Sequence, residues 1–226
     1  ALEVGIPLEP TGALLVAWSQ QQLVSFSTIQ EKARANKVEG LELLSASELA
    51  QQEPHLAPGA LGALRIPGES IICPYTPPLA YATQAKQNGV AIYLNHRVEA
   101  VEQGPHQTTL LGGDPRLTSR WVINAAGLYS DQIDGLFGHR RFSVTPRRGE
   151  LIVFDKFARS LIRHILLPVP TEKTKGVLIT PTVFGNVLLG PTAQDLEDKT
   201  DTTTSQQGLE SLLEKGGTLV PALLNE

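Results

Sequence analysis

The segment Trp121–Gly127 constrains the fold of this chain more than any other. Its first three residues, WVI, are apolar in succession rather than alternating, which is typical of a strand covered on both faces. The strand continues into the small-residue turn Asn-Ala-Ala-Gly, and a helix is expected next at Ser130–Phe137. A buried strand, a small-residue turn and a helix in this order predict a doubly wound α/β layer.

The same layer is expected to contain a second helix and a small meander. Thr76 is a good N-cap, Pro77 suits the first helical position and Asn88–Gly89 supplies a stop, so a helix is expected between them. Its apolar face includes Leu79 and Ala82. Extended segments are expected at Ala91–Leu94, Arg97–Glu102, Thr108–Leu111 and Leu117–Asn124.

The flanking sequence predicts a different, α+β arrangement. Ser19 with Gln22, and Ser45 with Glu48, have the spacing of a capping box, so each pair is expected to open a helix, and Pro54 to end the second. Strands are expected at Ala13–Ala17, Leu61–Ile66, Phe142–Phe154, His164–Val169, Val177–Thr180 and Asn186–Gly190, followed by a helix at Ser205–Glu214 that Gly216–Gly217 closes.

Two kinds of pattern therefore alternate along the chain. Residues 75–137 are expected to form part of an α/β nucleotide-type layer. Residues 1–74 and 138–226 are expected to build one α+β unit, whose antiparallel sheet is assembled from both sides of that insertion. The predicted fold class is accordingly α+β combined with α/β.

Composition excludes several classes of function. The 226 residues carry a formal net charge of −4, so the chain lacks the positive field that nucleic acid or anionic lipid would require. Its one cysteine, Cys73, excludes an internal disulfide and a multi-thiolate metal site, and the histidines have no metal-ligand spacing, so no metal is expected. The absence of Met and the abrupt ends lead us to expect an internal piece of a longer protein.

The turn at residues 124–127 also has a chemical use. Because its side chains are small, backbone amides can come close to a flat or phosphorylated ligand. Tight packing of the strand against the helix is the structural alternative, and the turn alone leaves both open.

Two further segments carry candidate binding groups. Arg147 and Arg148 precede a glycine and a strand, so their guanidinium groups are expected on opposite sides, with one able to bind a carboxylate or phosphate. Both arginines being solvated at a strand edge is the alternative. The triplets Thr180–Thr182 and Gly190–Thr192 are expected at matching ends of a hairpin, where hydroxyls and amides meet a ligand.

The stretch Ile66–Leu79 predicts a stiff crossover between the two units, a place where two-domain enzymes tend to bind ligands. It contains Cys73, which is more often a buried apolar residue than a nucleophile. A rigid linker is the alternative.

Several segments, taken in order, resemble the large FAD-dependent oxidoreductase family that includes D-amino-acid oxidase, and its branch with glycerol-3-phosphate dehydrogenase and L-2-hydroxyglutarate oxidase. The resemblance covers nearly the whole chain, and the order of the segments makes it specific. The segments are PTGALLVAW, ELLSASELAQQEPHL, GALRIPGESIICPY, KQNGV, NHRVEAVEQ, WVINAAGLYSDQI, PRRGELIVFD and GNVLLGPTAQDLEDKTDTTTS.

This resemblance implies a substrate domain with a mixed, largely antiparallel sheet, formed by residues 1–74 and 138–226. It implies that residues 75–137 are part of an FAD-binding Rossmann-like domain. The family's G-x-G-x-x-G segment and its last flavin-contacting segment have no counterpart here, and Cys73 replaces an acidic residue of many relatives. The implied cofactor contacts are Val98, Ala125, Ala126, Gly127 and Gly190, and the implied substrate-side residues are Tyr75, Arg148, Thr180 and Thr192.

The activity that the resemblance implies is oxidation of a small anionic hydroxy compound, either glycerol 3-phosphate or a 2-hydroxy acid, by hydride transfer to FAD. Electrons would pass to a quinone, oxygen or a partner subunit. A non-catalytic binding or subunit-contact module, and an amino-acid or amine oxidase of the same superfamily, stay open as alternatives. No general base is assigned, although His164 is a candidate.

The chain alone is expected to bind FAD weakly or not at all. The intact protein is expected in the cytoplasm, with association at the inner membrane face left open.

Overall fold

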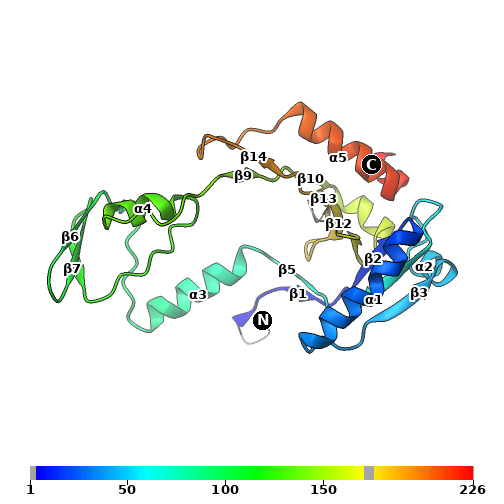
Figure 1. Cartoon of the computed structure of the whole chain (residues 1–226), viewed down its shortest axis with the longest axis horizontal. Coiled ribbons are helices and arrows are strands. Elements are labelled where there is room, and N and C mark those ends of the chain that lie inside the picture. The colour runs from blue at the N-terminus through cyan, green and yellow to red at the C-terminus, as the bar shows by residue number, and fades with distance from the viewer. Residues whose placement is uncertain (1–3, 171–175, 226) are drawn as a thin grey trace. The chain divides into compact units, whose positions relative to one another are not determined.

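The structure is a computed structural model that describes residues 4–170 and 176–225. Contacts divide the chain into a larger and a smaller compact unit, and the chain passes between them four times (Figure 1). The larger unit comprises Ala1–Ala82, Gly149–Ala193 and Thr203–Glu226, and the smaller unit comprises Thr83–Arg148 and Gln194–Thr202.

A seven-stranded sheet organises the larger unit, in the order β10-β13-β12-β11-β2-β4-β3. Every neighbouring pair is antiparallel except β11 and β2, which run parallel with Ile165 opposite Ala13. This mixed, largely antiparallel sheet confirms the predicted fold class. The strands are β2 (Ala13–Ala17), β3 (Glu42–Ser45), β4 (Gly62–Ile66), β10 (Ile152–Phe154), β11 (Ile165–Pro168), β12 (Leu178–Pro181) and β13 (Val187–Gly190), and a separate pair joins β1 (Leu8–Glu9) to β5 (Ile71–Ile72).

The interior strand β2 is buried along its whole length and supplies side chains to both faces of the sheet. Leu14 and Val16 join one core cluster, whereas Leu15 and Ala17 join the other, as the two-residue period of a strand requires. Phe26 of α1 (Gln20–Ala35) packs in the second cluster. The first cluster contains side chains from α2 (Ala46–Gln52), η3 (Lys156–Leu161), α5 (Gln206–Leu219) and η4 (Pro221–Asn225).

The first two helices begin where their capping residues predict. The Ser19 hydroxyl accepts a hydrogen bond from the Gln22 amide, and the Gln22 side chain in turn accepts from the backbone of Trp18. Ser45 and Glu48 form a complete capping box at the start of α2, which ends at Gln52, before Pro54.

Two predictions for the flanking segments of the chain were wrong. The last helix does not stop at Gly216–Gly217 but includes both glycines. Gly216 is explained by close packing instead of by a helix end, because a Cβ there would lie 2.6 Å from a Leu189 methyl. The strand expected at Phe142–Phe154 is two short strands, β9 (Arg147–Arg148) and β10, which pair with different partners.

The smaller unit consists of a meander, a short strand pair and helical segments. β9 pairs with β14 (Gln194–Asp195), and α3 (Thr76–Gln87) crosses the boundary between the units. The meander pairs β6 (Ala100–Gln103), β7 (Thr108–Leu111) and β8 (Leu117–Ser119), and η2 (Gly127–Tyr129) leads into α4 (Ser130–Leu136).

The strands expected at Ala91–Leu94 and Trp121–Asn124 do not form, and β8 ends at Ser119. Trp121 and Ile123 are 86% and 90% exposed rather than buried on both faces. A strand needs a neighbour for its backbone hydrogen bonds, and the described part of the chain pairs none with these residues.

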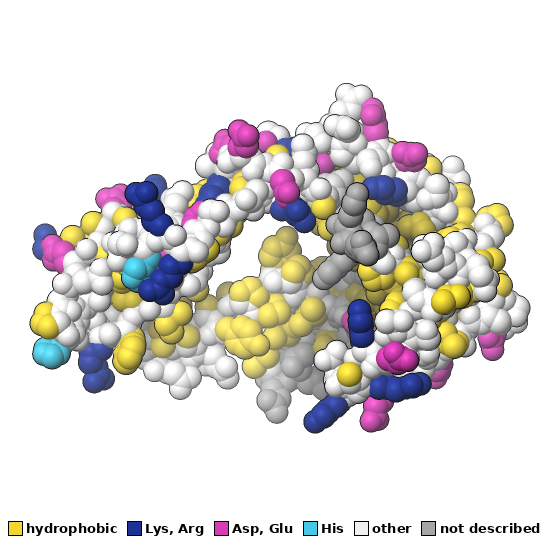
Figure 2. Space-filling model, viewed as in Figure 1, with side chains coloured by type: hydrophobic (Ala, Val, Ile, Leu, Met, Phe, Trp, Pro, Cys, Tyr) yellow, Lys and Arg dark blue, Asp and Glu magenta, His cyan; other side chains and the backbone are white. Residues whose placement is uncertain are grey.

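The smaller unit has no apolar core of its own among its described residues. Both core clusters consist of residues of the larger unit, and Pro146 is the one buried residue in the described part of the smaller unit. Figure 2 shows apolar side chains at the surface in the part of the view where Figure 1 places α4, β6 and β7. Such a surface is typical of a unit that other segments complete. The domain boundaries expected from the sequence stay a prediction.

Candidate functional site

The small-residue turn, residues 124–127, is shaped by the side chain of Asn124. Its Oδ1 accepts a hydrogen bond from the Ala126 amide at 3.3 Å, and its Nδ2 donates to the Ser130 carbonyl at 2.8 Å. The same side chain therefore closes the turn and ties it to the start of α4.

The turn presents its backbone to solvent. Ala125, Ala126 and Gly127 are all exposed, and no atom lies within 4 Å of the position that a Cβ on Gly127 would take. Gly127 has a φ of +54°, a left-handed conformation that glycine adopts without steric cost. An open, small-residue surface of this kind fits the approach of a flat ring system such as that of FAD, and the three cofactor contacts stay predictions.

An ion pair lies at the start of α4, the helix that follows this turn. Lys199 Nζ is 2.6 and 2.7 Å from the two carboxylate oxygens of Asp131, and Oδ2 of Asp131 also accepts from the Val144 amide at 2.9 Å. Hydrogen bonds from Lys199, and then from Val144, hold the pKa of Asp131 below its usual value. The sequence did not single out either partner, because they are 68 residues apart.

Val98 lies in an extended stretch just before β6 and is partly exposed. Pairing with β7 starts beside it, where the Glu99 amide donates to the Leu111 carbonyl at 2.8 Å. Gly112 permits this approach, because a Cβ there would overlap the Arg97 carbonyl and lie 2.8 Å from the Glu99 nitrogen. The backbone at Val98 is thus held in place, as its predicted adenine contact requires.

Arg148 already has an anionic partner. Its guanidinium lies 3.2 and 3.3 Å from the carboxylate oxygens of Asp201 and donates to Gln194 Oε1 at 2.8 Å. The side chain is 13% exposed, whereas that of Arg147 is 63% exposed and pairs with Asp195. The two arginines thus lie in different environments, as a strand predicts, but a substrate anion at Arg148 would compete with Asp201.

The predicted hydroxyl contacts on the β12–β13 hairpin do not lie together. In this antiparallel pair Pro181 is opposite Val187, near the turn, and Leu178 is opposite Gly190, at the open end. The triplets Thr180–Thr182 and Gly190–Thr192 therefore lie at opposite ends, so the expectation of matching ends was wrong. Each triplet lies at the C-terminal end of its strand, and in an antiparallel pair the two C-terminal ends lie at opposite edges of the sheet.

Thr192 is held by Glu150, a buried carboxylate that the sequence did not single out. The Glu150 amide donates to Thr192 Oγ1 at 2.9 Å, and this hydroxyl donates to Glu150 Oε2 at 3.2 Å. The other carboxylate oxygen accepts from the backbone of Ser205, the N-cap of α5. Thr180 donates to the Pro181 carbonyl at 3.0 Å, so both threonine hydroxyls have intramolecular partners.

Three other candidates have different surroundings. Tyr75 is exposed between β5 and α3, and Cys73 is buried with its amide donating to the Pro7 carbonyl at 3.3 Å. His164 Nδ1 lies 2.7 Å from Oε1 of Glu53, which is 1% exposed and also accepts from the His164 amide at 2.7 Å. Glu53 thus buttresses His164 within the larger unit.

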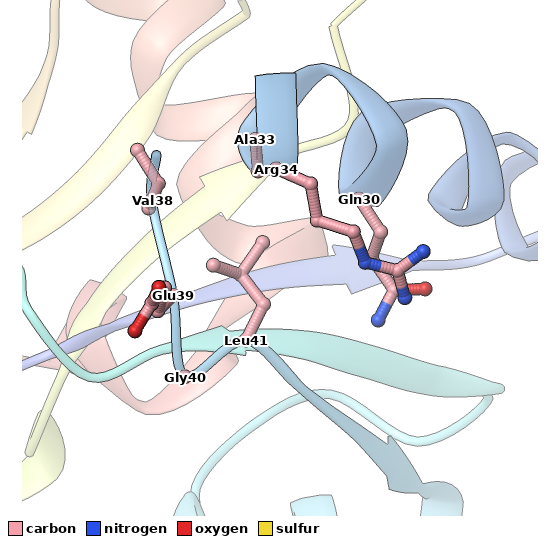
Figure 3. Close-up of a pocket in the computed structure, with 7 residues that line it drawn as sticks. All are labelled: Gln30, Ala33, Arg34, Val38, Glu39, Gly40 and Leu41. Carbon is pink, nitrogen blue, oxygen red and sulfur yellow. The ribbon is translucent and has the colours of Figure 1, made fainter. Parts of the chain in front are cut away.

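Neither of two surface hollows contains a predicted site residue. One, of about 220 Å³, lies at the end of α1 in the larger unit and is lined by residues that include Gln30, Arg34 and Leu41 (Figure 3). The other, of about 570 Å³, lies in the smaller unit beside Asp131 and Arg141.

Among the described residues no group of three or more His, Cys, Asp or Glu side chains could hold a metal. The described helices include none that is long and apolar enough to cross a bilayer.

A comparison of the sequence with known protein families agrees with the open turn and the mixed sheet. The chain belongs to the FAD dependent oxidoreductase family, which it matches over residues 1–226. This confirms the family that the ordered segments resemble.

The chain is also similar to individual proteins of this kind. Glycerol 3-phosphate dehydrogenase of Caloramator mitchellensis is 32% identical over 212 residues, which are 94% of this chain and 44% of that protein. Mitochondrial L-2-hydroxyglutarate dehydrogenase of Bos taurus is 28% identical over 206 residues, which are 84% of this chain and 44% of that protein. The structure of dithionite-reduced L-α-glycerophosphate oxidase from Mycoplasma pneumoniae with FAD bound matches with a TM-score of 0.90 at 28% identity, covering 96% of this chain and 59% of that one. The chain thus spans about half the length of these relatives.

Proposed function

We propose that this chain is part of an FAD-dependent enzyme that oxidises a small anionic hydroxy compound, either glycerol 3-phosphate or a 2-hydroxy acid. The observation that carries the proposal is 32% identity to a glycerol 3-phosphate dehydrogenase over 94% of the chain. The open turn at Gly127 supports it independently. When bound, FAD supplies the acceptor for a hydride from the carbon that bears the hydroxyl.

In this proposal the smaller unit carries four of the five cofactor contacts. Asn124 fixes the turn, so that the backbone at Ala125, Ala126 and Gly127 stays open for the cofactor, and Val98 approaches the adenine from the stretch before β6. Fixed small-residue surfaces hold a flat ligand without first reorganising.

The larger unit carries the proposed substrate-side residues Tyr75, Thr180 and Thr192, and it also carries the fifth proposed cofactor contact, Gly190. Glu150 holds Thr192 in one rotamer through two hydrogen bonds. Arg148 binds the substrate anion in this proposal only when Asp201 releases it. A guanidinium suits a carboxylate or phosphate because it donates two parallel hydrogen bonds.

The test is anaerobic reduction of the full-length flavoprotein that contains this chain. We expect glycerol 3-phosphate or an L-2-hydroxy acid to bleach the flavin absorbance, and amino acids to leave it unchanged. Bleaching by amino acids alone would make the protein an amino-acid oxidase. A full-length protein that holds no flavin would instead favour the non-catalytic module.

A second test uses the chain by itself. It contains no G-x-G-x-x-G segment to seat the FAD phosphates on a helix N-terminus, so we expect no stoichiometric flavin after purification. Flavin absorbance at one equivalent per chain would contradict this. For the intact protein we propose the cytoplasm and an electron acceptor that is a quinone, oxygen or a partner subunit; cell fractionation and assays with each acceptor distinguish these.

A further inference from the structure

We propose that Lys199 is a positioning residue for the cofactor turn, holding it through Asp131 and Tyr129. This inference rests on the proposed function, because it assumes that residues 125–127 contact FAD. Neither Lys199 nor Asp131 belongs to the proposed contact surface itself.

The Asp131 carboxylate joins three parts of the smaller unit. One oxygen accepts from the Gln132 amide at 2.8 Å within α4, and the other accepts from the Val144 amide at 2.9 Å. Lys199 Nζ bonds both oxygens, and the two side chains are each 16% exposed. An ion pair this shielded from solvent, with its carboxylate bonded on both oxygens, is stronger than a typical surface pair.

Lys199 also contacts the short segment that joins the turn to α4. Its ammonium lies 5.9 Å from the centre of the Tyr129 ring, within the range of a cation–π interaction. Tyr129 is the last residue of η2, which begins at Gly127. One cation thus contacts Tyr129, two residues after the turn, and Asp131 in the first turn of α4.

The segment that carries Lys199, residues 194–202, is anchored on both sides of it. Arg147 pairs with Asp195, and Arg148 pairs with Asp201. Lys199 is the one cation of this segment, which also contains four carboxylates. Removing its charge would leave Asp131 without its cationic partner in this segment, so the segment would be held less tightly against α4.

The physical consequence is that cofactor retention depends on a residue far along the chain from the turn. Asn124 fixes the turn from within, whereas Lys199 fixes its position relative to the loop at Val144. Loss of Lys199 should therefore loosen the cofactor before it unfolds the protein.

The experiment compares variants of the full-length holoenzyme by FAD titration and by the visible circular dichroism of the bound flavin. Lys199→Met should raise the Kd for FAD about tenfold, the loss expected for a hydrogen-bonded charge, and should change the flavin dichroism. Lys199→Arg should retain the wild-type Kd within about threefold, since it keeps the charge. Lys86→Met, at an exposed lysine near the end of α3, is the matched control and should leave both readouts unchanged.

A second pair of variants keeps the test decisive if Lys199→Met folds poorly. Lys199→Gln preserves a polar chain and should show the same loss of FAD, while adding Asp131→Asn to it should cost little more. The inference is overturned if the Lys199 variants bind FAD with wild-type Kd and dichroism, or if they lose only thermal stability. If the wild-type protein itself binds no FAD, the proposed function fails instead.

Discussion

Replacing Gly208 by alanine would place a methyl group where the Glu150 carboxylate now lies. The added Cβ would overlap Glu150 Oε2 and lie 2.9 Å from the Ser205 hydroxyl. Glu150 is 6% exposed and accepts hydrogen bonds from the Ser205 amide and the Thr192 hydroxyl, so it cannot turn away without losing both. The substitution therefore acts on a buried charge rather than on the helix.

The magnitude follows from these contacts. Hydrogen bonds to a charged group stabilise by about 1.5–3 kcal/mol each, whereas alanine in place of glycine favours a helix by about 1 kcal/mol. The net effect expected for Gly208→Ala is a loss of roughly 2–5 kcal/mol in the free energy of unfolding.

The assay is chemical denaturation of the full-length protein, followed by tryptophan fluorescence. Gly135→Ala is the matched control: Gly135 is a helical glycine of α4 with no atom within 4 Å of its Cβ position. It should leave stability unchanged or raise it by up to about 1 kcal/mol. A Gly208→Ala protein as stable as wild type would refute the assignment of Glu150 as an anchor of α5.

Three further predictions concern the candidate site. Asp201→Asn frees Arg148 from its carboxylate and should lower the KM for an anionic substrate several-fold; an unchanged KM with a lower melting temperature would give Arg148 a structural role. Gly127→Ala should cost about 1 kcal/mol in backbone strain and also weaken FAD binding in a titration, whereas Gly138→Ala, also at positive φ with open space, should cost the strain alone. Because the pKa of Asp131 is lowered in the folded state, the stability that its carboxylate contributes is present above the usual carboxyl pKa and is lost as pH falls through the lowered value. An acid titration that follows flavin release should therefore show loss of bound flavin below the usual carboxyl range. Asp131→Asn should abolish this step.

Local signals in the sequence predicted local structure well. The starts of α1 and α2 depend on side chains within four residues of the cap, so Ser19 and Ser45 identified them. The helix end predicted at Gly216 was wrong, because the residue that explains this glycine, Leu189, lies on another element. A glycine signals a helix end or close packing, and only the packing partner distinguishes them.

The candidate site was predictable only in part. The turn at Gly127 and the partly buried position of Arg148 follow from residue type and alternation, whereas the partners of these groups do not. Asp131 with Lys199, and Arg148 with Asp201, join positions 68 and 53 residues apart, for which no spacing rule exists. The expectation of a buried strand at Trp121 failed because burial depends on neighbours as well as on the strand's own sequence.

The parallel pairing of β2 with β11 has a consequence for how the chain is made. Strand β2 is synthesised well before β11 and can pair with β4 once both strands have emerged from the ribosome, but its other edge stays unpaired until Ile165–Pro168 has been synthesised. During that interval an apolar strand offers free backbone groups to any passing chain. Nascent chains that stall before β11 should therefore depend on chaperones, and those that extend past β13 should not.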